Sequence, residues 1–483
     1  MKLREIIEGL EVCGSRGDIN VDITDICCDS RKVTPGALFI AVRGFESDGH
    51  DYIGAAIEKG AAAVICETPS ERPGITEIRV KNSRLAAALA ADAFFGHPSR
   101  ELCLVGITGT NGKTTTVTLL YNMFTSLGYH CGLLSTIANY VGRERLETSN
   151  TTADPITINR LLARMVSEGC TYCFMEVSSI GVEQDRVSGL HFAAGIFSNL
   201  THDHLDYHKT FAEYLRCKKL FFDNLPKEAF AIINTDDKNG LVMVQNSKAK
   251  LVTYALKTMA DHRARILEQS FEGMLLNIDG HETWIRLSGV HNAYNALAIY
   301  TTAVCLGVES TEALVALSKL QAAPGRLETI SAPRGINVVI DYAHTPDALE
   351  NVLKTLREVA PEAQLICLFG CGGDRDKTKR PEMAQVAEKL ADRLVITSDN
   401  PRTEKPEDII ADIRSGLSLN GLAKSIFITD RREAIRTAIL TAPERATILL
   451  AGKGHETYQI IGKEKHHFDE KEIVFESCKL MTL

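Results

Sequence analysis

A glycine-rich loop with a lysine and threonines is the clearest chemical feature of the sequence. Residues 106–116 read Gly-Ile-Thr-Gly-Thr-Asn-Gly-Lys-Thr-Thr-Thr and follow an apolar run at 102–105. Glycines let backbone N–H groups turn toward an anion, Lys113 adds positive charge, and the Thr114 hydroxyl can ligate Mg²⁺. A strict loop of this kind has glycine at position 107, where this chain has isoleucine. The segment therefore predicts phosphate binding through a variant loop.

Polar side chains also follow several expected strands. The expected strands and the residues after them are 172–175 with Glu176, 195–198 with Asn199, 338–340 with Asp341, and 394–397 with Asp399 and Asn400. Ligands of open α/β sheets bind beyond the carboxyl ends of the strands, so these side chains are candidates for one catalytic region. Mg²⁺ prefers oxygen ligands, and one histidine among them is compatible. Glu176, Thr114 and His204 therefore predict a Mg²⁺ site, with a structural core role as the alternative for His204.

Two later motifs place arginines after strands. One covers residues 370–375 and ends at Arg375; the other covers 399–402 and ends at Arg402. The first motif lacks glycine at its last position and so fails as a dinucleotide-binding fingerprint. A planar guanidinium can hold a carboxylate through two parallel hydrogen bonds. These motifs therefore predict recognition of a carboxylate-bearing ligand.

The elements that must position these residues follow from periodicity. After the glycine-rich loop, Val117, Leu120, Phe124 and Leu127 recur at helical spacing, and Gly128 stands where a helix stop is expected. Beyond residue 98, short β-branched runs alternate with helical patterns, which is typical of parallel sheets covered by helices on both faces. We therefore expect an α/β fold.

Turn-forming residues divide the chain into three expected domains. Gly-His-Pro-Ser at 96–99 ends the first, and Ala-Pro-Gly-Arg at 323–326 ends the second. The expected domains are 1–97, 98–325 and 326–483. A chain of 483 residues is long enough for several cores.

Composition limits the partners. The net charge of −8 and the absence of Lys/Arg runs argue against general binding of nucleic acid or anionic membranes. The N-terminus lacks an apolar signal core, and the alanine-rich stretch 85–95 is too short to span a bilayer. An odd number of cysteines, 13, indicates reduced thiols, and Cys170-x-x-Cys173 has no second pair nearby. We expect a cytoplasmic monomer without membrane insertion.

The ordered series of motifs resembles the Mur ligases. The matching segments are T-G-T-N-G-K-T-T at 108–115, E-V-S-S at 176–179, N-L-x-x-D-H-x-D at 199–206, G-x-H-N-x-x-N at 289–295 and D-Y-A-H-x-P at 341–346. Folylpolyglutamate synthetases share the first of them. The resemblance extends over essentially the whole chain.

This resemblance implies a fold and an activity. The fold would be a central P-loop mononucleotide-binding parallel sheet, flanked by an N-terminal uridine-nucleotide-binding α/β domain and a C-terminal Rossmann-like α/β domain. The activity would be an ATP-dependent ligase reaction of cytoplasmic peptidoglycan precursor synthesis. It would add meso-diaminopimelate to the D-glutamate γ-carboxylate of UDP-N-acetylmuramoyl-L-alanyl-D-glutamate through an acyl phosphate.

The resemblance also assigns the ATP and metal residues. Those expected to bind ATP are Gly109, Thr110, Asn111, Gly112, Lys113, Thr114, Thr115, His291, Asn292, Asn295, Asp341 and His344. Those expected to serve catalysis directly are Lys113, Glu176, His204 and Lys218. Lys218 matches a lysine that family members carry as a carbamate, which would join Thr114, Glu176 and His204 around Mg²⁺. Carbamate formation requires a neutral amine. A solvated Lys218-Lys219 pair is the alternative.

The remaining substrates have their own expected residues. The UDP-muramoyl dipeptide is assigned to Ser30, Asn150, Thr151, Thr152, Ser178, Gln184 and Arg186, with an exposed, uninvolved arginine as the alternative for Arg186. Diaminopimelate is assigned to Arg375, Asp399, Asn400, Pro401, Arg402, Gly452 and Glu456. Family members that add diaminopimelate carry D-N-P-R, whereas those that add lysine usually lack that arginine. Glu456 suits the distal ammonium.

Three other functions stay open. An L-lysine-adding ligase differs only in its amino acid, and a folylpolyglutamate synthetase would use the same acyl-phosphate chemistry. The uridine-type first domain and D-N-P-R weigh against the synthetase. A non-catalytic nucleotide switch is the third, although the chain lacks an N-K-x-D base-reading motif.

Overall fold

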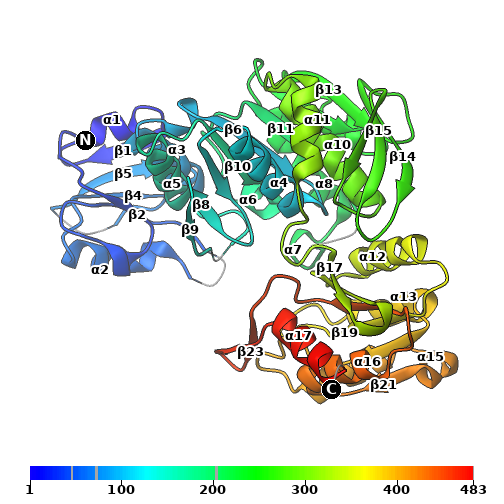
Figure 1. The fold of residues 1–483 in the computed structure, drawn as a ribbon. Helices are drawn as coiled ribbons and strands as arrows, with labels where there is room; N and C mark the ends of the chain where they lie inside the picture. The colour runs from blue at the N-terminus through cyan, green and yellow to red at the C-terminus, as the bar shows by residue number, and fades with distance from the viewer. Residues whose placement is uncertain (45–46, 71–73, 149, 202–204, 482–483) are drawn as a thin grey trace. The chain divides into compact units, whose positions relative to one another are not determined.

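The computed structural model describes residues 1–44, 47–70, 74–148, 150–201 and 205–481 (Figure 1). The chain forms two compact units. The first consists of Met1–Gly109, Leu120–Ser198 and Ala212–Thr253, and the second of Thr110–Leu119, Asn199–Phe211 and Tyr254–Leu483.

The first unit begins with a five-stranded sheet in the order β1-β5-β4-β3-β2. Its strands are β1 (Val12–Arg16), β2 (Ile26–Cys27), β3 (Leu38–Ile40), β4 (Ala63–Cys66) and β5 (Thr76–Val80). β2 to β5 pair in parallel, and β1 runs antiparallel to β5. One face packs under α1 (Leu3–Ile7) and α3 (Ser83–Phe94), and the other under α2 (Ile53–Glu58).

A second sheet of the first unit is centred on β6 (Cys103–Thr108). β10 (Tyr172–Glu176) and β11 (Ala194–Phe197) flank β6 in parallel, and β7 (Cys131–Leu134) and β12 (Phe230–Asn234) continue outward in parallel. These strands are almost wholly buried because their apolar side chains alternate into helix layers on both faces. The sequence-predicted strands 172–175 and 195–198 are therefore confirmed to within a residue at each end.

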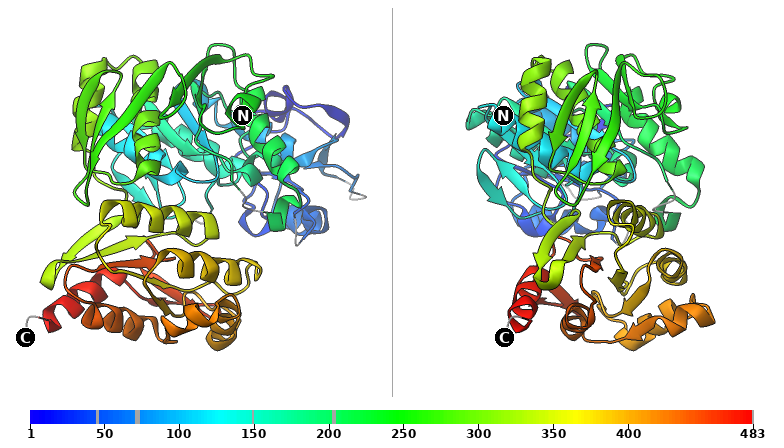
Figure 2. Two further views of the ribbon diagram at one scale, coloured as in Figure 1. Left: turned by 90° about the vertical axis from the view of Figure 1, so that its right-hand side faces the viewer. Right: turned by 45° about the vertical axis from the view of Figure 1, so that its right-hand side comes forward.

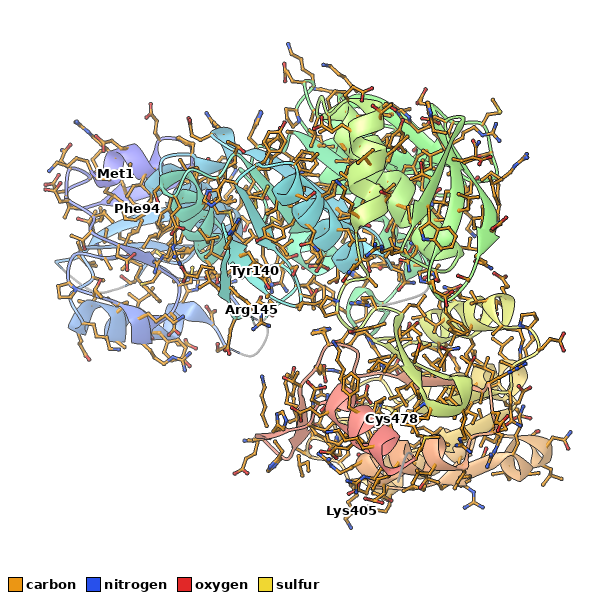
Figure 3. The ribbon with its side chains drawn as sticks, in the orientation of Figure 1. Met1, Phe94, Tyr140, Arg145, Lys405 and Cys478 are labelled. Atoms are coloured by element: carbon orange, nitrogen blue, oxygen red, sulfur yellow. The ribbon has the colours of Figure 1, made fainter. Side chains whose placement is uncertain are left out.

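The outer edge beyond β7 is antiparallel, which the sequence did not predict. β8 (Asn139–Val141) and β9 (Glu144–Leu146) form a hairpin on β7. Tyr140 lies opposite Arg145 across this hairpin (Figure 3). Three-residue strands with mostly polar side chains carry too little periodicity to be read from sequence.

The helices of this part of the chain lie between residues 113 and 243. They are α4 (Lys113–Ser126), α5 (Pro155–Ser167), α6 (Ser179–Glu183), α7 (Leu205–His208), α8 (Phe211–Asp223) and α9 (Gly240–Met243). α4 begins at Lys113, as the periodicity after the loop predicts, and Gly128 takes a left-handed conformation just beyond its end.

The second unit carries an antiparallel sheet of three strands, β14 (His262–Gln269), β15 (Met274–Ile278) and β16 (His281–Ile285). The end of β13 (Lys250–Ala255) pairs with β14 in parallel. The helices α10 (Val290–Cys305) and α11 (Ser310–Lys319) pack against this sheet. α10 is buried on most sides, which explains its largely uninterrupted apolar sequence.

The rest of the second unit is a six-stranded sheet in the order β17-β18-β22-β19-β20-β21. The strands are β17 (Glu328–Ala332), β18 (Ile336–Asp341), β19 (Leu365–Phe369), β20 (Arg393–Ile396), β21 (Ser425–Phe427) and β22 (Thr447–Ala451). All pairs are parallel except β17 with β18. A separate hairpin joins β23 (Tyr458–Ile461) to β24 (Glu464–His467).

Helices cover both faces of this sheet, as Figure 2 shows. The helices on one face are α12 (Pro346–Val359), α13 (Lys379–Leu390) and α14 (Pro406–Arg414), and those on the other are α16 (Arg431–Thr441) and α17 (Glu470–Leu480). α15 (Leu419–Ala423) precedes β21. The predicted α/β fold class is confirmed.

Two further expectations concern membranes and thiols. Within the described ranges, no helix combines the length and apolarity needed to cross a bilayer. All 13 cysteines fall in these ranges, and each is a free thiol.

Candidate active site

The glycine-rich loop is held by the segment after β11. The Thr110 N–H donates to the Asn199 carbonyl (2.8 Å), and the Asn111 N–H donates to Asn199 Oδ1 (2.9 Å). Thr110 Oγ1 accepts from the Thr201 N–H (2.9 Å). Gly112 has φ +86°, and a Cβ there would lie 2.5 Å from Asn295 Oδ1. Glycine at 112 is therefore required by both conformation and space.

Lys113 and Thr114 open helix α4. Lys113 Nζ donates to the Thr110 carbonyl across the loop (2.9 Å). Thr114 and Thr115 are buried, and Thr114 Oγ1 accepts from Arg326 Nη2 at 3.4 Å. These residues stand at a helix N-terminus, where backbone N–H groups and the helix dipole favour an anion.

Arg326 is a residue that the sequence analysis treated only as part of a domain boundary. Its guanidinium lies 4.8 Å from the ring centroid of Tyr342 and contacts Thr114. The Pro-Gly turn before Arg326 gave no indication of these contacts, since turn residues are normally interpreted as connectors. The structure brings this cation to the phosphate loop.

Asn292 and Asn295 form a chain at the start of α10. Asn292 Nδ2 donates to the Ser288 carbonyl (2.9 Å), Asn295 Nδ2 donates to Asn292 Oδ1 (3.0 Å), and Asn295 Oδ1 accepts from Thr116 Oγ1 (3.4 Å). Burial lowers the pKa of His291 to about 4, so its imidazole is neutral at pH 7. The predicted residues of α10 and of the loop are thus brought together.

Asp341 ends β18 and binds backbone on both sides. Its carboxylate accepts from the N–H groups of Leu327 and Ala343, both at 2.8 Å. Burial raises the pKa of Asp341. His344 is exposed, and its Nδ1 lies 2.8 Å from the Tyr342 carbonyl oxygen. Asp341 therefore shapes the turn that carries Arg326 and Tyr342.

Asp347, in the first turn of α12, was missed by the sequence analysis. Its Oδ2 accepts from Asn111 Nδ2 (2.9 Å) and from Thr201 Oγ1 (3.0 Å). An acidic residue in a first helical turn is ordinary, so its type gave no signal.

Glu176 and Lys218 lie in the first unit and are each 1% exposed. Glu176 accepts from the Thr136 N–H (2.8 Å) and from Thr136 Oγ1 (3.1 Å). Lys218 Nζ donates to the Gly109 carbonyl (2.8 Å) and lies 4.7 Å from the Tyr214 ring centroid. The alternative of a solvated lysine pair is therefore wrong. His204, the fourth expected metal ligand with Thr114, lies outside the described residues.

The residues assigned to the muramoyl peptide cluster beside Glu176. Thr152 Oγ1 donates to the Glu176 carbonyl (2.9 Å) and accepts from the Ser178 N–H (3.0 Å). Arg186 donates to the Thr152 carbonyl (2.6 Å) and, through Nε and Nη2, to Gln184 Oε1 at 3.1 and 2.7 Å. Arg186 is half-buried, so the exposed-arginine alternative is wrong.

The other members of that set lie at different positions. Thr151 Oγ1 accepts from Thr136 Oγ1 (3.1 Å), which ties it to the same cluster. Asn150 is exposed just before it. Ser30 belongs to the short 3₁₀ helix Ser30–Lys32, next to the five-stranded sheet.

The C-terminal motifs form one cluster at the carboxyl ends of β19, β20 and β22. Arg402 Nη1 donates to the Gly373 carbonyl (2.8 Å), and a Cβ on Gly372 would lie 2.8 Å from the same nitrogen. A Cβ on Gly452 would lie 2.8 Å from Asp399 Oδ2. The glycines therefore allow the three strand ends to meet. Pro401 is buried, whereas Arg375 is exposed.

Asn400 links these strand ends to Glu456. Asn400 Nδ2 donates to Glu456 Oε2 (2.8 Å), and Asn400 Oδ1 accepts from the Ile460 N–H (2.9 Å). The Arg402 N–H donates to the Ile460 carbonyl (3.1 Å) and holds Arg402 at φ +51°. The β23 strand was not expected to contribute, because its sequence gave no chemical motif.

Buried ion pairs lie around this cluster. Arg431 is 1% exposed and donates to Glu470 Oε1 (2.8 Å) and to the carbonyls of Ser398 (3.3 Å) and Ala451 (2.8 Å). Arg380 donates to both oxygens of Glu404, at 3.0 and 2.9 Å. Long-range pairs such as these cannot be matched from sequence, since nothing local identifies the partner.

Comparison with known families gives three matches along the chain. Residues 22–94 match the Mur ligase family, catalytic domain; residues 107–303 match the Mur ligase middle domain; and residues 325–454 match the Mur ligase, glutamate ligase domain.

Curated relatives match over the full length. A UDP-N-acetylmuramoyl-L-alanyl-D-glutamate--2,6-diaminopimelate ligase from Bacteroides fragilis is 52% identical, over 99% of this chain and 100% of that protein. A ligase of the same name from Clostridioides difficile is 43% identical, over 100% of both chains.

Two solved structures are similar to this chain over nearly its whole length. A structure of UDP-N-acetylmuramoyl-L-alanyl-D-glutamate--2,6-diaminopimelate ligase aligns with a TM-score of 0.72 at 32% identity, covering 100% of this chain and 99% of that one. A MurF ligase from Thermotoga maritima in complex with ADP shares the fold at 17% identity, with a TM-score of 0.62 over 96% and 98% of the two chains. The three family matches and the full-length relatives together establish that this chain belongs to the Mur ligase family.

Proposed function

We propose that the chain is an ATP-dependent amide ligase that joins meso-diaminopimelate to UDP-N-acetylmuramoyl-L-alanyl-D-glutamate. The observation that carries this proposal is the C-terminal cluster, in which Asn400 bonds both Glu456 and Ile460 of β23, and Ile460 in turn bonds the Arg402 backbone. Full-length relatives of the same named activity support it. Its setting would be cytoplasmic peptidoglycan precursor synthesis, with the chain acting as a monomer.

The reaction requires activation of a carboxylate, which is a poor electrophile. The γ-phosphoryl group of ATP is transferred to the D-glutamate γ-carboxylate, giving an acyl phosphate and ADP. The diaminopimelate amine then attacks the acyl carbon, phosphate leaves, and the amine loses a proton. Catalysis therefore consists largely of positioning and charge stabilisation.

The phosphate loop positions ATP. The glycine-rich loop from Gly109 to Thr115 would surround the phosphates at the N-terminus of α4, and the Lys113 ammonium, now on the Thr110 carbonyl, would bind the γ-phosphoryl oxygens. Arg326, already at Thr114, is well placed to offset charge on the same group. His291, Asn292 and Asn295 would contact the adenine or ribose of ATP. Asp341 and His344 are assigned to ATP binding as well.

We propose Mg²⁺ as the metal ion, because it favours oxygen donors. Thr114, Glu176, His204 and a carbamate on Lys218 would hold it, and the ion would neutralise charge that develops on the transferred phosphoryl group. Deep burial of Lys218 beside carbonyl oxygens supports a role for its amine other than as a solvated cation.

The acceptor substrate would bind along the first unit. Ser30 lies with the domain proposed for the uridine nucleotide. The loop Asn150 to Thr152 with Ser178, Gln184 and Arg186 is proposed for the muramoyl peptide. The Arg186 guanidinium supplies charge for a peptide carboxylate.

The amino acid is selected at the C-terminal cluster. Arg375 and Arg402 would hold carboxylates, and Glu456 the distal ammonium. Asp399, Pro401 and Gly452 would line the amino-acid site. The Asn400 amide already bonds Glu456 and Ile460, so we assign it to positioning the residues that line this site. A lysine substrate has no distal carboxylate for Arg402.

The test is ADP release by the purified chain with ATP, Mg²⁺ and the UDP-muramoyl dipeptide. Reactions with meso-diaminopimelate, with L-lysine and without amino acid are compared. Release that depends on diaminopimelate is expected. Preference for lysine would refute the specificity while sparing the ligase chemistry. If neither amino acid supported ADP release, the proposed function would be refuted.

A further inference from the structure

Lys453 is a buried cation at the centre of the C-terminal cluster. It follows β22 directly after Gly452, and its side chain is 0% exposed. The rings of Tyr458 and Phe468 lie 5.9 and 5.8 Å from Nζ. A lysine ammonium is retained in such a place only when anions and hydrogen-bond acceptors surround it.

The acceptors of Lys453 include Glu456, which is proposed to bind the amino acid, and Asn400, which is proposed to position that site. Its Nζ donates to Asn400 Oδ1 (3.1 Å), Glu456 Oε2 (3.3 Å) and the Tyr458 carbonyl (2.7 Å). Asp399 Oδ1 lies 3.4 Å from the same nitrogen. One ammonium therefore joins the D-N-P-R loop, Glu456 and the β23 strand.

These contacts fix the orientation of Glu456. Its Oε2 receives both Lys453 and Asn400 Nδ2, so the carboxylate is held by one of its oxygens. The second oxygen, Oε1, is the one left for a substrate ammonium. Two carboxylates, Asp399 and Glu456, lie 3.4 and 3.3 Å from the ammonium of this one lysine.

We infer that Lys453 is a positioning residue for amino-acid selection, acting through Glu456 and Asn400. This inference rests on the proposed function, because it assigns Lys453 to the diaminopimelate site. Without the lysine, Glu456 loses one of its two anchors and keeps only the bond from Asn400 Nδ2. Displacement of a binding group by about 1 Å can reduce activity about 100-fold.

The test is steady-state kinetics of the full chain with diaminopimelate varied and, separately, ATP varied. The variants are Lys453→Met, Glu456→Gln and the double variant, with Lys463→Met in the exposed hairpin turn as the matched control. Lys453→Met should raise KM for diaminopimelate about 100-fold and leave KM for ATP unchanged. Lys463→Met should behave as wild type.

The double variant separates positioning from a merely structural role. If Lys453 acts through Glu456, the double variant should have the same KM for diaminopimelate as Glu456→Gln alone. Multiplied losses, or an equal rise in KM for ATP, would overturn the inference. If Lys453→Met fails to fold, as judged by thermal unfolding, Lys453→Gln replaces it, since an amide keeps donors but lacks the charge. Wild-type chain without diaminopimelate-dependent release would instead overturn the proposed function.

Discussion

The phosphate loop and the amino-acid cluster are built in different ways. The loop depends on consecutive residues, with Gly112 in a left-handed conformation and Lys113 bonded back to the Thr110 carbonyl. The amino-acid cluster depends on residues far apart in sequence, held by buried ions such as Lys453. A site built from consecutive residues can be predicted from one motif. A site built from residues far apart in sequence is indicated only by separate short motifs, and the buried residues that join them are not identified.

The largest expected effect tests the local site. Lys113→Ala should reduce phosphate release at least about 1,000-fold, because a positioned cation at the transferred phosphoryl group is lost. Turnover is measured with all three substrates, with the exposed Lys238→Ala as control. Wild-type turnover in the Lys113 variant would show that the loop is not catalytic.

A second change tests the dispersed site. Arg402→Lys keeps the charge but removes the planar, paired donors, so kcat/KM for diaminopimelate should fall about 100-fold. KM for ATP should stay constant. An equal change in the kinetics of diaminopimelate and of ATP would mean that the amino-acid cluster and the phosphate loop do not act as separate sites.

Backbone shape gives a smaller effect. Gly112→Ala places a Cβ against Asn295 at a residue with φ +86°, so ADP affinity should fall and folding should lose about 1–2 kcal/mol. Isothermal titration with ADP and thermal unfolding measure the two effects. Gly9→Ala is the control, since a Cβ there meets nothing within 4 Å. Equal behaviour of the two variants would contradict the tight-loop argument.

The smallest expected effect depends on pH. Hydrogen bonds from Arg380 lower the pKa of Glu404 to about 2, compared with about 4.3 in an unfolded chain. A lowered pKa means that this residue stabilises the fold above about pH 4.3 and loses that contribution as pH falls toward 2.

Glu404→Gln should therefore lower the free energy of unfolding at pH 7 and have a progressively smaller effect from pH 4 to pH 2. Urea unfolding at several pH values measures this, with the exposed Glu407→Gln as control. A constant difference between Glu404→Gln and wild type across that pH range would rule out the proposed charge pairing.

The fold was largely predictable. Buried strands such as β10 and β11 stand out as apolar runs, and the start of α4 follows from its periodicity. The antiparallel edges β8–β9 and β14–β16 were not predicted. Their strands are short or half-exposed, so their side chains lack a clear pattern.

Site residues that lie within a recognisable sequence motif were predictable, whereas residues brought to the site only by the fold were not. Thr152, Ser178 and Arg186 were assigned to one substrate, and hydrogen bonds join Thr152 to both Ser178 and Arg186 in the structure. Arg326, Asp347 and Lys453 were not identified. Their types are common in turns, helix starts and surfaces, and only the folded contacts distinguish them.

Arg402 occupies a left-handed backbone conformation, which most L-residues avoid. Glycine would relieve about 1 kcal/mol of that strain, but glycine has no side chain with which to bind a ligand. If Arg402 selects the amino acid, as proposed, this loop is less stable than it would be with glycine at that position. A laboratory selection for heat resistance alone should favour glycine at position 402, and the resulting enzyme should be harder to unfold and less able to distinguish amino acids.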